Sequence, residues 1–480
     1  MKLNSILKKI ILGVFALLLV YVGVVMTANW NDDTLSPAAQ QLLEPSRNTA
    51  ADASNGYFTL LGINAPKETD AHAAGLRIQA GYERQFREQP MRITFANDEP
   101  EIKQTADDIK AWDALHCSLT QADCVTHYLR NAPIVRERIK AEGALLARYA
   151  EIMRLPAYEQ KLIPSYSISI RPFPHETFDR AARLYLAMAV LDIEAGHADE
   201  GISGIVANIS LHRRQLASSR SIFSMSASIG MLREDYEILS EVLEHWPALA
   251  RTQADSLAKI LRPLDENETD FRQFLQDTAR TSAFVLAHSG ERASQDSPGD
   301  LATKDGRWSR LRAALTGRCC FLPNATLNLA ATYWSDLAQA GHGSAATLDA
   351  RKQRFMAIYT PKLTAPFRAP WTAIRNPGGI VLMAVIDGNG RLFADMERLH
   401  DLDGYIRLVT LQSALRRDQV AGNAASAYAA KAPPGMRNPY NGEAMRWDAA
   451  SSSLLFEGRP GASADPPSAK KGYRIKMAMP

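Results

Sequence analysis

The chain has very little cysteine, with four cysteines among 480 residues. Neither a C-x-x-C pair nor a histidine at ligand spacing accompanies them, so they indicate no metal site and no disulfide-rich small fold. At roughly 150 residues per domain, a chain of this length can bury a core without such supports.

A bias toward charge of one sign is also lacking. Lysine and arginine total 55 against 52 for aspartate and glutamate, which gives a net charge of +3. The near balance predicts no broad basic surface of the kind that binds phosphate backbones. We therefore expect no nucleic-acid partner.

Catalytic signatures are the third thing that the sequence lacks. We find no G-x-S-x-G nucleophile motif, no phosphate-binding P-loop and no G-x-G-x-x-G dinucleotide motif. These patterns mark serine hydrolases and nucleotide-binding proteins. Their absence leaves the catalytic residues unassigned, and we expect no cofactor.

One long hydrophobic run is present, because residues 10–26 carry no charge. As a helix they extend roughly 26 Å, enough for a thin bilayer, and Trp30 follows at the place of an interfacial aromatic. The alternative is a cleaved signal peptide, which has a shorter core and small residues before the cut. Here the −3 place relative to Ala28 is occupied by Met26, which is not a small residue. We predict an uncleaved membrane anchor over residues 1–28.

Charges flank this run asymmetrically: three lysines precede it and two aspartates follow it (Lys2, Lys8, Lys9, Asp32 and Asp33). The positive-inside rule then places the N-terminus in the cytoplasm and the rest of the chain outside it. The expected protein is a single-pass inner-membrane protein with a periplasmic domain.

The cysteines suit an oxidising compartment. Cys117 and Cys124 bracket a short polar loop, which predicts a disulfide between them. The alternative is two thiols two turns apart on one helix, too distant to bond. The adjacent Cys319 and Cys320 can bridge only through a strained ring, and their redox state stays open.

The predicted fold class is mainly α. A polar stalk broken by proline and glycine covers residues 29–66, and a first helical block covers 67–288. A loop rich in serine, glycine and aspartate, 289–308, precedes a second helical block over 309–430. The last segment, 431–480, is predicted to be a small antiparallel β meander.

Helical hairpins dominate the blocks. Residues 175–217 have the pattern of two helices joined at Gly196, and Pro247 ends the next helix. The apolar run Ile380–Ile386 is either a buried strand or a short helix, because periodicity cannot distinguish the two. From Phe393 to Arg417 the apolar spacing is helical.

The C-terminal segment begins with the turn sequence N-P-Y-N-G. Pro439 presets φ, and Gly442 can adopt the positive φ that the turn requires. Alternating apolar residues then predict the strands Ala444–Asp448, Ser453–Gly458 and Tyr473–Met479. Because two or three strands are not stable alone in water, we expect the sheet to pack its apolar face on the Phe393–Arg417 helix, with Trp447 buried.

This segment resembles a known pattern, Asn/Asp-Pro-Tyr/Phe-Ser/Thr-Gly-x-Pro-Met/Leu-x-Trp/Tyr after a helix. The matching residues are Asn438, Pro439, Tyr440, Gly442, Met445 and Trp447. Asn441 replaces the serine or threonine, and Ala444 replaces the second proline. The pattern is that of uncharacterised, membrane-anchored envelope proteins of proteobacteria. The resemblance implies an envelope location and no particular activity.

Three local motifs partly match known chemical sites. His175, Glu176 and Asp179 nearly match the zinc motif H-E-x-x-H but lack its second histidine, and they suit a helix start after Pro174. The S-x-x-K pair Ser256 and Lys259 lacks its companion motifs. The run Asp401, Asp403 and Gly404 hints at a calcium loop, but its glycine is fourth, not sixth. We assign all three to helix surfaces.

Two functions remain open from sequence. The first is a binding or scaffold role toward another envelope protein. The second is a hydrolase or transferase that acts on an envelope polymer or lipid. A deep pocket lined by convergent ionisable groups would favour the enzyme, whereas a shallow apolar groove would favour binding.

Overall fold

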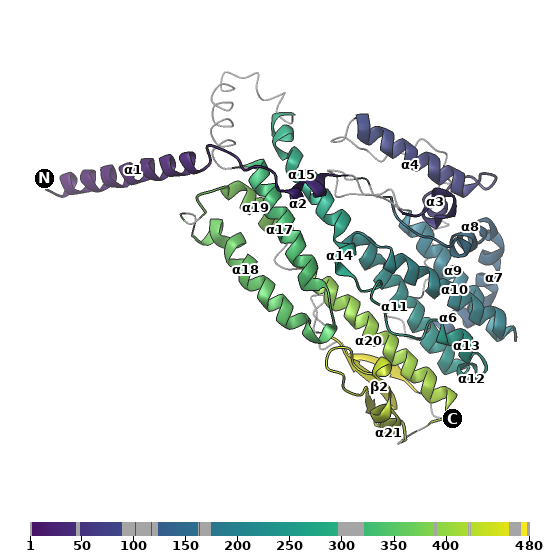
Figure 1. Cartoon of the computed structure of the whole chain (residues 1–480). Helices are drawn as coiled ribbons and strands as arrows, with labels where there is room; N and C mark the ends of the chain where they lie inside the picture. Colours follow the sequence, from purple (N-terminus) through teal and green to yellow (C-terminus); the bar gives the residue numbers. More distant parts are fainter. Residues whose placement is uncertain are drawn as a thin grey trace. The chain divides into compact units, whose positions relative to one another are not determined.

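The computed structural model is mainly α-helical with one small antiparallel sheet, which confirms the predicted fold class (Figure 1). It describes residues 2–44, 49–88, 101, 117, 123–161, 163, 174–295, 321–369, 371, 373–387, 391–420, 422, 424–459 and 472–477. Cys319 and Cys320 lie outside these residues.

The chain forms two compact units, each assembled from segments far apart in sequence. The first unit comprises Met1–Pro45, Thr278–Ala340 and Ala350–Leu392. The second unit comprises Ser46–Asp277, Gly341–Asp349 and Phe393–Pro480. This differs from the consecutive blocks expected from sequence. The expected loop 289–308 also begins within a helix, because α15 covers Gln276–Gln295.

The first unit contains the N-terminal helix α1 (Lys2–Ala28), whose segment Lys8–Ala28 is long and apolar enough to cross a membrane. No part of that segment is buried within the structure. The other helices that lie wholly or mainly in this unit are α2 (Pro37–Leu43), α15, α17 (Pro323–Gly341), α18 (Leu348–Arg368) and α19 (Pro377–Asp387).

The segment Ile380–Ile386 is helical, which settles the alternative left open by its sequence. It belongs to α19, which begins at Pro377, a residue suited to the first helical position. Its last residue, Asp387, accepts a hydrogen bond from the hydroxyl of Tyr333. The Tyr333 ring packs edge-on against Tyr359 in the core of this unit.

The residues that follow α1 are hydrogen-bonded directly into the first unit. The Asp32 carboxylate accepts two backbone N–H groups in the first turn of α17, at 2.8 and 3.0 Å. The Asn29 side chain accepts from the N–H of Asn376 and donates to the carbonyl of Ile374, both at 2.7 Å. This part of the predicted stalk is therefore folded.

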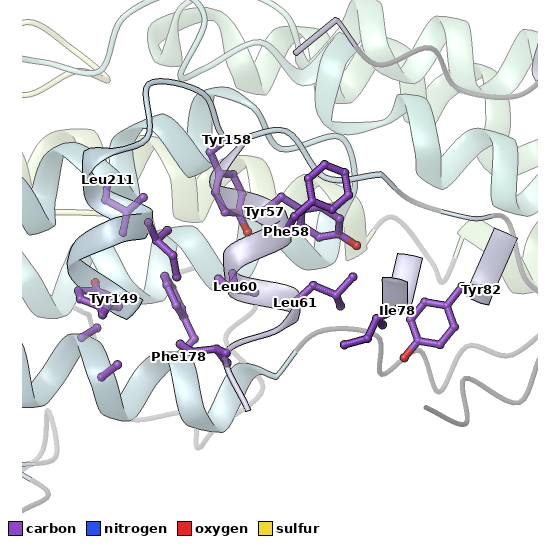
Figure 2. Close-up of a cluster of buried hydrophobic side chains, with 14 residues drawn as sticks. Tyr57, Phe58, Leu60, Leu61, Ile78, Tyr82, Tyr149, Tyr158, Phe178 and Leu211 are labelled. Carbon is purple, nitrogen blue, oxygen red and sulfur yellow. The ribbon is translucent and has the colours of Figure 1, made fainter. Parts of the chain in front are cut away.

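The end of the predicted stalk is also folded, in the core of the second unit. Helix α3 (Gly56–Leu61) is buried along its whole length, and Tyr57 and Phe58 lie among aromatic and aliphatic side chains (Figure 2). Its sequence is nearly all apolar, and the Asn55 side chain caps it by accepting from the N–H of Tyr57 at 3.1 Å. Residues 56–61 are therefore not part of an exposed stalk, because a helical segment with so many apolar side chains is stable only when they are buried.

Helical hairpins form the body of the second unit. Helices α9 (His175–Glu194) and α10 (Ala198–Ala217) are joined at Gly196, whose φ of +90° suits glycine. Helix α11 (Ile222–His245) ends before Pro247, as predicted. The further helices that belong wholly or mainly to this unit are α4 (Ala71–Glu88), α6 (Cys124–Arg130), α7 (Ala132–Ala141), α8 (Gly143–Arg154), α12 (Leu249–Thr252), α13 (Ala254–Ala258), α14 (Phe271–Phe274), α20 (Arg391–Arg417) and α21 (Ala424–Lys431).

A disulfide joins Cys117 to Cys124, as the sequence predicts. Cys124 is the first residue of α6, whereas Cys117 precedes that helix. The two thiols are therefore not on one helix, and their Cα atoms lie 5.5 Å apart.

The C-terminal sheet is the predicted antiparallel meander, with strand order β1 (Arg446–Asp448), β2 (Ser453–Glu457) and β3 (Gly472–Lys476). It packs on α20, as expected. The Phe456 ring lies so close to Gly404 that a Cβ added there would come within 2.1 Å of it. Tyr473 packs against Tyr405 with ring centroids 5.7 Å apart.

The N-P-Y-N-G turn is also present: the N–H of Gly442 donates to the carbonyl of Asn438 at 2.9 Å, and Gly442 has a φ of +72°. Trp447 corrects one expectation, because it is half-buried, not buried. It lies on β1, a three-residue edge strand paired only with β2, so part of its side chain remains exposed.

Candidate functional site

A closed polar cluster lies inside the second unit, among helices α8, α10 and α11. We call it the His212 network, and it consists of Tyr149, Asn208, His212 and Asp235. Each of the four residues is at most 1% exposed. Asn208 and His212 are one turn apart on α10 and therefore share one face of that helix.

The four side chains of the His212 network form a ring of hydrogen bonds. His212 Nδ1 lies 2.6 Å from Asp235 Oδ2, and Asn208 Nδ2 donates to Asp235 Oδ1 at 2.8 Å. The Tyr149 hydroxyl donates to Asn208 Oδ1 at 2.5 Å and lies 3.2 Å from His212 Nε2.

The order tyrosine, histidine, aspartate is that of a nucleophile, its base and an orienting carboxylate. A nucleophile must nevertheless reach a substrate, and Tyr149 is completely buried. Burial, reinforced by the charge of Asp235, raises the pKa of Tyr149 well above its usual value. Tyr149 is thus a neutral hydrogen-bond donor that joins α8 to α10.

Two acids with displaced pKa values lie beside this network. Arg183 Nε is 3.2 Å from a carboxylate oxygen of Asp179, and its Nη2 is 3.0 Å from Glu234. Burial raises the pKa of Asp179 to about 6 and that of Glu234 to about 7, although Arg183 lowers the latter. Both carboxyls therefore titrate near neutral pH.

These two acids predict that the second unit loses stability as the pH rises from about 4 to about 7. Each group holds its proton more tightly in the folded unit than in the unfolded chain. The resulting stabilisation is complete below the ordinary pKa values of 3.8 and 4.5 and is lost as the pH passes about 6 to 7. Thermal unfolding of the full chain in detergent, repeated across this pH range, measures how steeply the stability of the second unit falls with pH.

The variant Glu234→Gln is expected to flatten this slope, since glutamine has no proton to lose. The matched control is Glu176→Gln, because Glu176 is exposed in the first turn of α9. A Glu234→Gln profile parallel to that of the unchanged chain would contradict the assignment.

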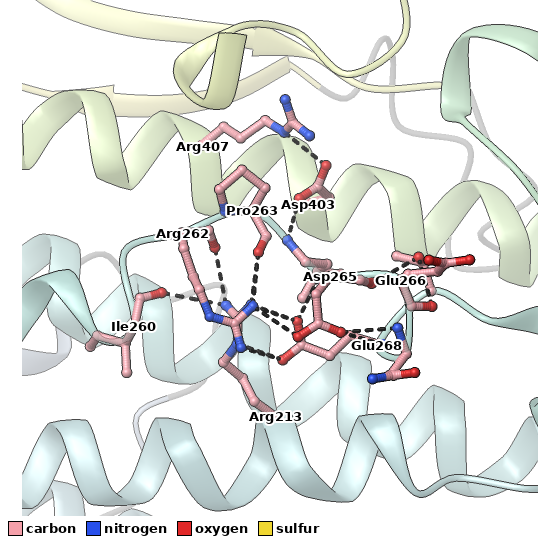
Figure 3. Close-up of polar contacts among 12 residues, drawn as sticks. Arg213, Ile260, Arg262, Pro263, Asp265, Glu266, Glu268, Asp403 and Arg407 are labelled. Atoms are coloured by element: carbon pink, nitrogen blue, oxygen red, sulfur yellow. Dashed lines mark hydrogen bonds and ion pairs between the residues drawn. The ribbon is translucent and has the colours of Figure 1, made fainter. Parts of the chain in front are cut away.

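A second buried polar cluster, the Arg213 clasp, holds the loop after α13 (Figure 3). Arg213 and Glu268 form a two-pronged ion pair, with Nε–Oε1 at 2.7 Å and Nη2–Oε2 at 2.6 Å. Their side chains are 4% and 3% exposed. Arg213 also donates to the Tyr236 hydroxyl at 2.9 Å and to the loop carbonyls of Ile260, Arg262 and Pro263.

Helix α20 joins this loop through Asp403, which accepts from the N–H of Leu264 at 2.8 Å and pairs with Arg407 at 2.8 Å. Asp401 instead accepts from the Tyr440 hydroxyl at 2.7 Å. Gly404 faces Phe456 of the sheet. The run first compared with a calcium loop therefore connects α20 to its neighbours.

The remaining sequence candidates do not converge. His175 and Glu176 are exposed at the start of α9, whereas Asp179 pairs with Arg183. Ser256 lies on the short helix α13 and Lys259 follows it, exposed. Within the part of the chain that the structure describes, no group of three or more His, Cys, Asp or Glu residues is placed to hold a metal ion.

Sequence reasoning missed both buried clusters. One signal was available: Asn208, His212 and Gln215 form a polar stripe on a helix whose other residues are largely apolar. Nothing in the sequence pairs that stripe with Asp235, or the neighbouring Arg213 with Glu268. Comparisons with protein-family models, curated proteins and solved structures found no match to this chain.

Proposed function

We propose that this protein is a single-pass inner-membrane protein whose helical domain lies outside the cytoplasm and binds another envelope protein. The apolar segment Lys8–Ala28 supports membrane attachment. The lysines before it and the aspartates after it support the orientation. The resemblance of the C-terminal element supports an envelope location.

The observation that carries this proposal is the junction after α1. Asn29 and Asp32 are hydrogen-bonded to α17 and to the residues just before α19, so no free linker separates the anchor from the first unit. Arg375 adds a hydrogen bond to the carbonyl of Ala28 at 2.6 Å. A domain held at a set distance from the bilayer loses less freedom when it binds a partner in the same membrane.

The alternative is an enzyme that acts on an envelope polymer or lipid. The tyrosine, histidine and aspartate of the His212 network are the residues that favour it. Their complete burial favours the binding role, because a reacting group must contact its substrate. Turnover of any envelope polymer or lipid that is abolished by Tyr149→Phe in a folded chain would favour the enzyme.

The orientation predicts that alkaline phosphatase fused after residue 60 will be active, because this reporter folds only outside the cytoplasm, where its disulfides form. The matched control is the same fusion after conversion of the three leading lysines to glutamate, which should lower its activity. An inactive fusion, together with an active cytoplasmic reporter at the same place, would overturn the assignment.

Capture of the tagged full chain from crosslinked membranes tests the binding role. We expect at least one envelope protein to be enriched over a control chain that contains only α1 and α2. Since the control retains the anchor, any protein captured equally by both chains reports membrane proximity alone. No enrichment over that control would contradict the proposal.

A further inference from the structure

Several large apolar side chains of the first unit are exposed outside α1. We refer to five of them together as the junction face: Trp30 is 79% exposed, Phe367 64%, Trp371 67%, Leu382 37% and Val385 73%. Single exposed apolar residues are ordinary, but this set includes two tryptophans and a phenylalanine within one unit.

The junction face is tied to the end of the candidate membrane span. Trp30 directly follows Asn29, whose side chain bonds to the carbonyl of Ile374 and the N–H of Asn376. Trp371 precedes Ile374 by three residues, so its Cα lies within about 10 Å of that contact. The backbone of both tryptophans therefore lies close to the point where α1 ends.

Helix α19 extends the junction face with an apolar surface of its own. It begins directly after Asn376, and its sequence P-G-G-I-V-L-M-A-V-I-D has no charge before the last residue. Met383 is buried inside the unit, whereas Leu382 and Val385 are exposed. At about 16 Å, the helix is too short to cross a bilayer but long enough to lie at its surface.

The segment 350–386 of the first unit carries charge of one sign, although Asp33, close to Trp30 in sequence, pairs with Arg375. Residues 350–386 contain no aspartate or glutamate, but they contain the basic residues Arg351, Lys352, Arg354, Lys362, Arg368 and Arg375. Lys362 and Arg368 are exposed on α18, on either side of Phe367 in sequence. Such cations are attracted to anionic lipid headgroups.

We propose that the junction face lies in the headgroup region of the bilayer that α1 crosses, so that the first unit binds lipid beside its own anchor. The bilayer is the occupant because the hydrogen bonds of Asn29 and Arg375 hold Trp30 and the start of α19 at the point where the candidate span ends. Tryptophan prefers that interface, where its apolar ring and its N–H are both accommodated.

Tryptophan quenching in vesicles tests the proposal. The full chain is reconstituted in phosphatidylethanolamine and phosphatidylglycerol vesicles with a nitroxide on the lipid headgroup, and flotation verifies that it is inserted. We expect Trp371→Phe to lose part of the lipid-quenched emission, and Trp30→Phe to do the same. The matched control is Trp334→Phe, since Trp334 is 4% exposed in the same unit and should leave the quenched component unchanged.

Two quenching results would contradict the proposal. Quenching of Trp371 by aqueous acrylamide but not by the lipid nitroxide would place the face in water and overturn the proposal. Protection of Trp371 from both quenchers would assign the face to contact with protein, which also overturns it. Because no second protein is present, failure here leaves the proposed binding of an envelope partner untouched.

Discussion

Replacing Arg213 with alanine is expected to lower the free energy of unfolding of the second unit by about 3–5 kcal/mol, because it leaves a buried carboxylate without its main partner. Glu268 is 3% exposed and, among the described residues, would keep Arg262 and a backbone N–H as donors. Three carbonyls of the loop after α13 would also lose the guanidinium to which they are all hydrogen-bonded.

The matched control is Arg417→Ala. Arg417 pairs with Asp418 at 2.8 Å, but the two side chains are 48% and 38% exposed. Solvent screens such a pair, so its loss should change stability by no more than about 1 kcal/mol. Denaturant titration of the full chain in detergent, followed through the second-unit transition, compares the two variants. Equal midpoints would refute the structural role of the clasp.

The second large effect is expected for His212→Ala, at about 3–5 kcal/mol, because the buried Asp235 carboxyl would lose the partner that lies 2.6 Å from it. The side chain of Asp235 is 2% exposed, and within the described part of the chain the Asn208 amide alone would continue to donate to it. Removal of the imidazole also leaves a cavity among packed helices, which adds to the cost.

A double-mutant cycle isolates the interaction itself. If His212 and Asp235 stabilise each other, the combined variant His212→Ala with Asp235→Ala should cost less than the sum of the single variants. His245→Ala is the control, since its contact with Asp123 is 3.1 Å long but the two side chains are 31% and 41% exposed. Additive effects of the two core substitutions would contradict the network.

Local pattern sufficed for the elements whose signals lie within a few residues. Gly196 and Pro247 mark helix ends from sequence alone. Glycine can adopt a positive φ and proline has no backbone N–H to donate, and both properties affect the conformation of the adjacent backbone only. The turn at Pro439 and Gly442 and the three strands after it follow from turn chemistry and a period of two. The packing of the sheet on α20 was also predictable from sequence, because so small a sheet must cover its apolar face to be stable.

Ambiguous segments needed tertiary structure. The run Ile380–Ile386 is too short and too uniformly apolar for its period to distinguish a helix from a strand. Residues 56–61 lie in a polar stretch of sequence, so their burial in the core depended on a site built by helices further along the chain. Trp447 was expected to be buried, but only the position of β1 at the sheet edge decided its exposure.

The sequence by itself determined the candidate anchor, the helical class, the disulfide and the C-terminal meander, because composition, periodicity and turn chemistry are local properties. Only the tertiary structure decided that the chain alternates between two units, and that His212 meets Asp235 while Arg213 meets Glu268. Those partners are 23 and 55 residues apart in sequence. A helical pattern specifies which face of a helix is buried, but not which side chain of another helix that face will meet.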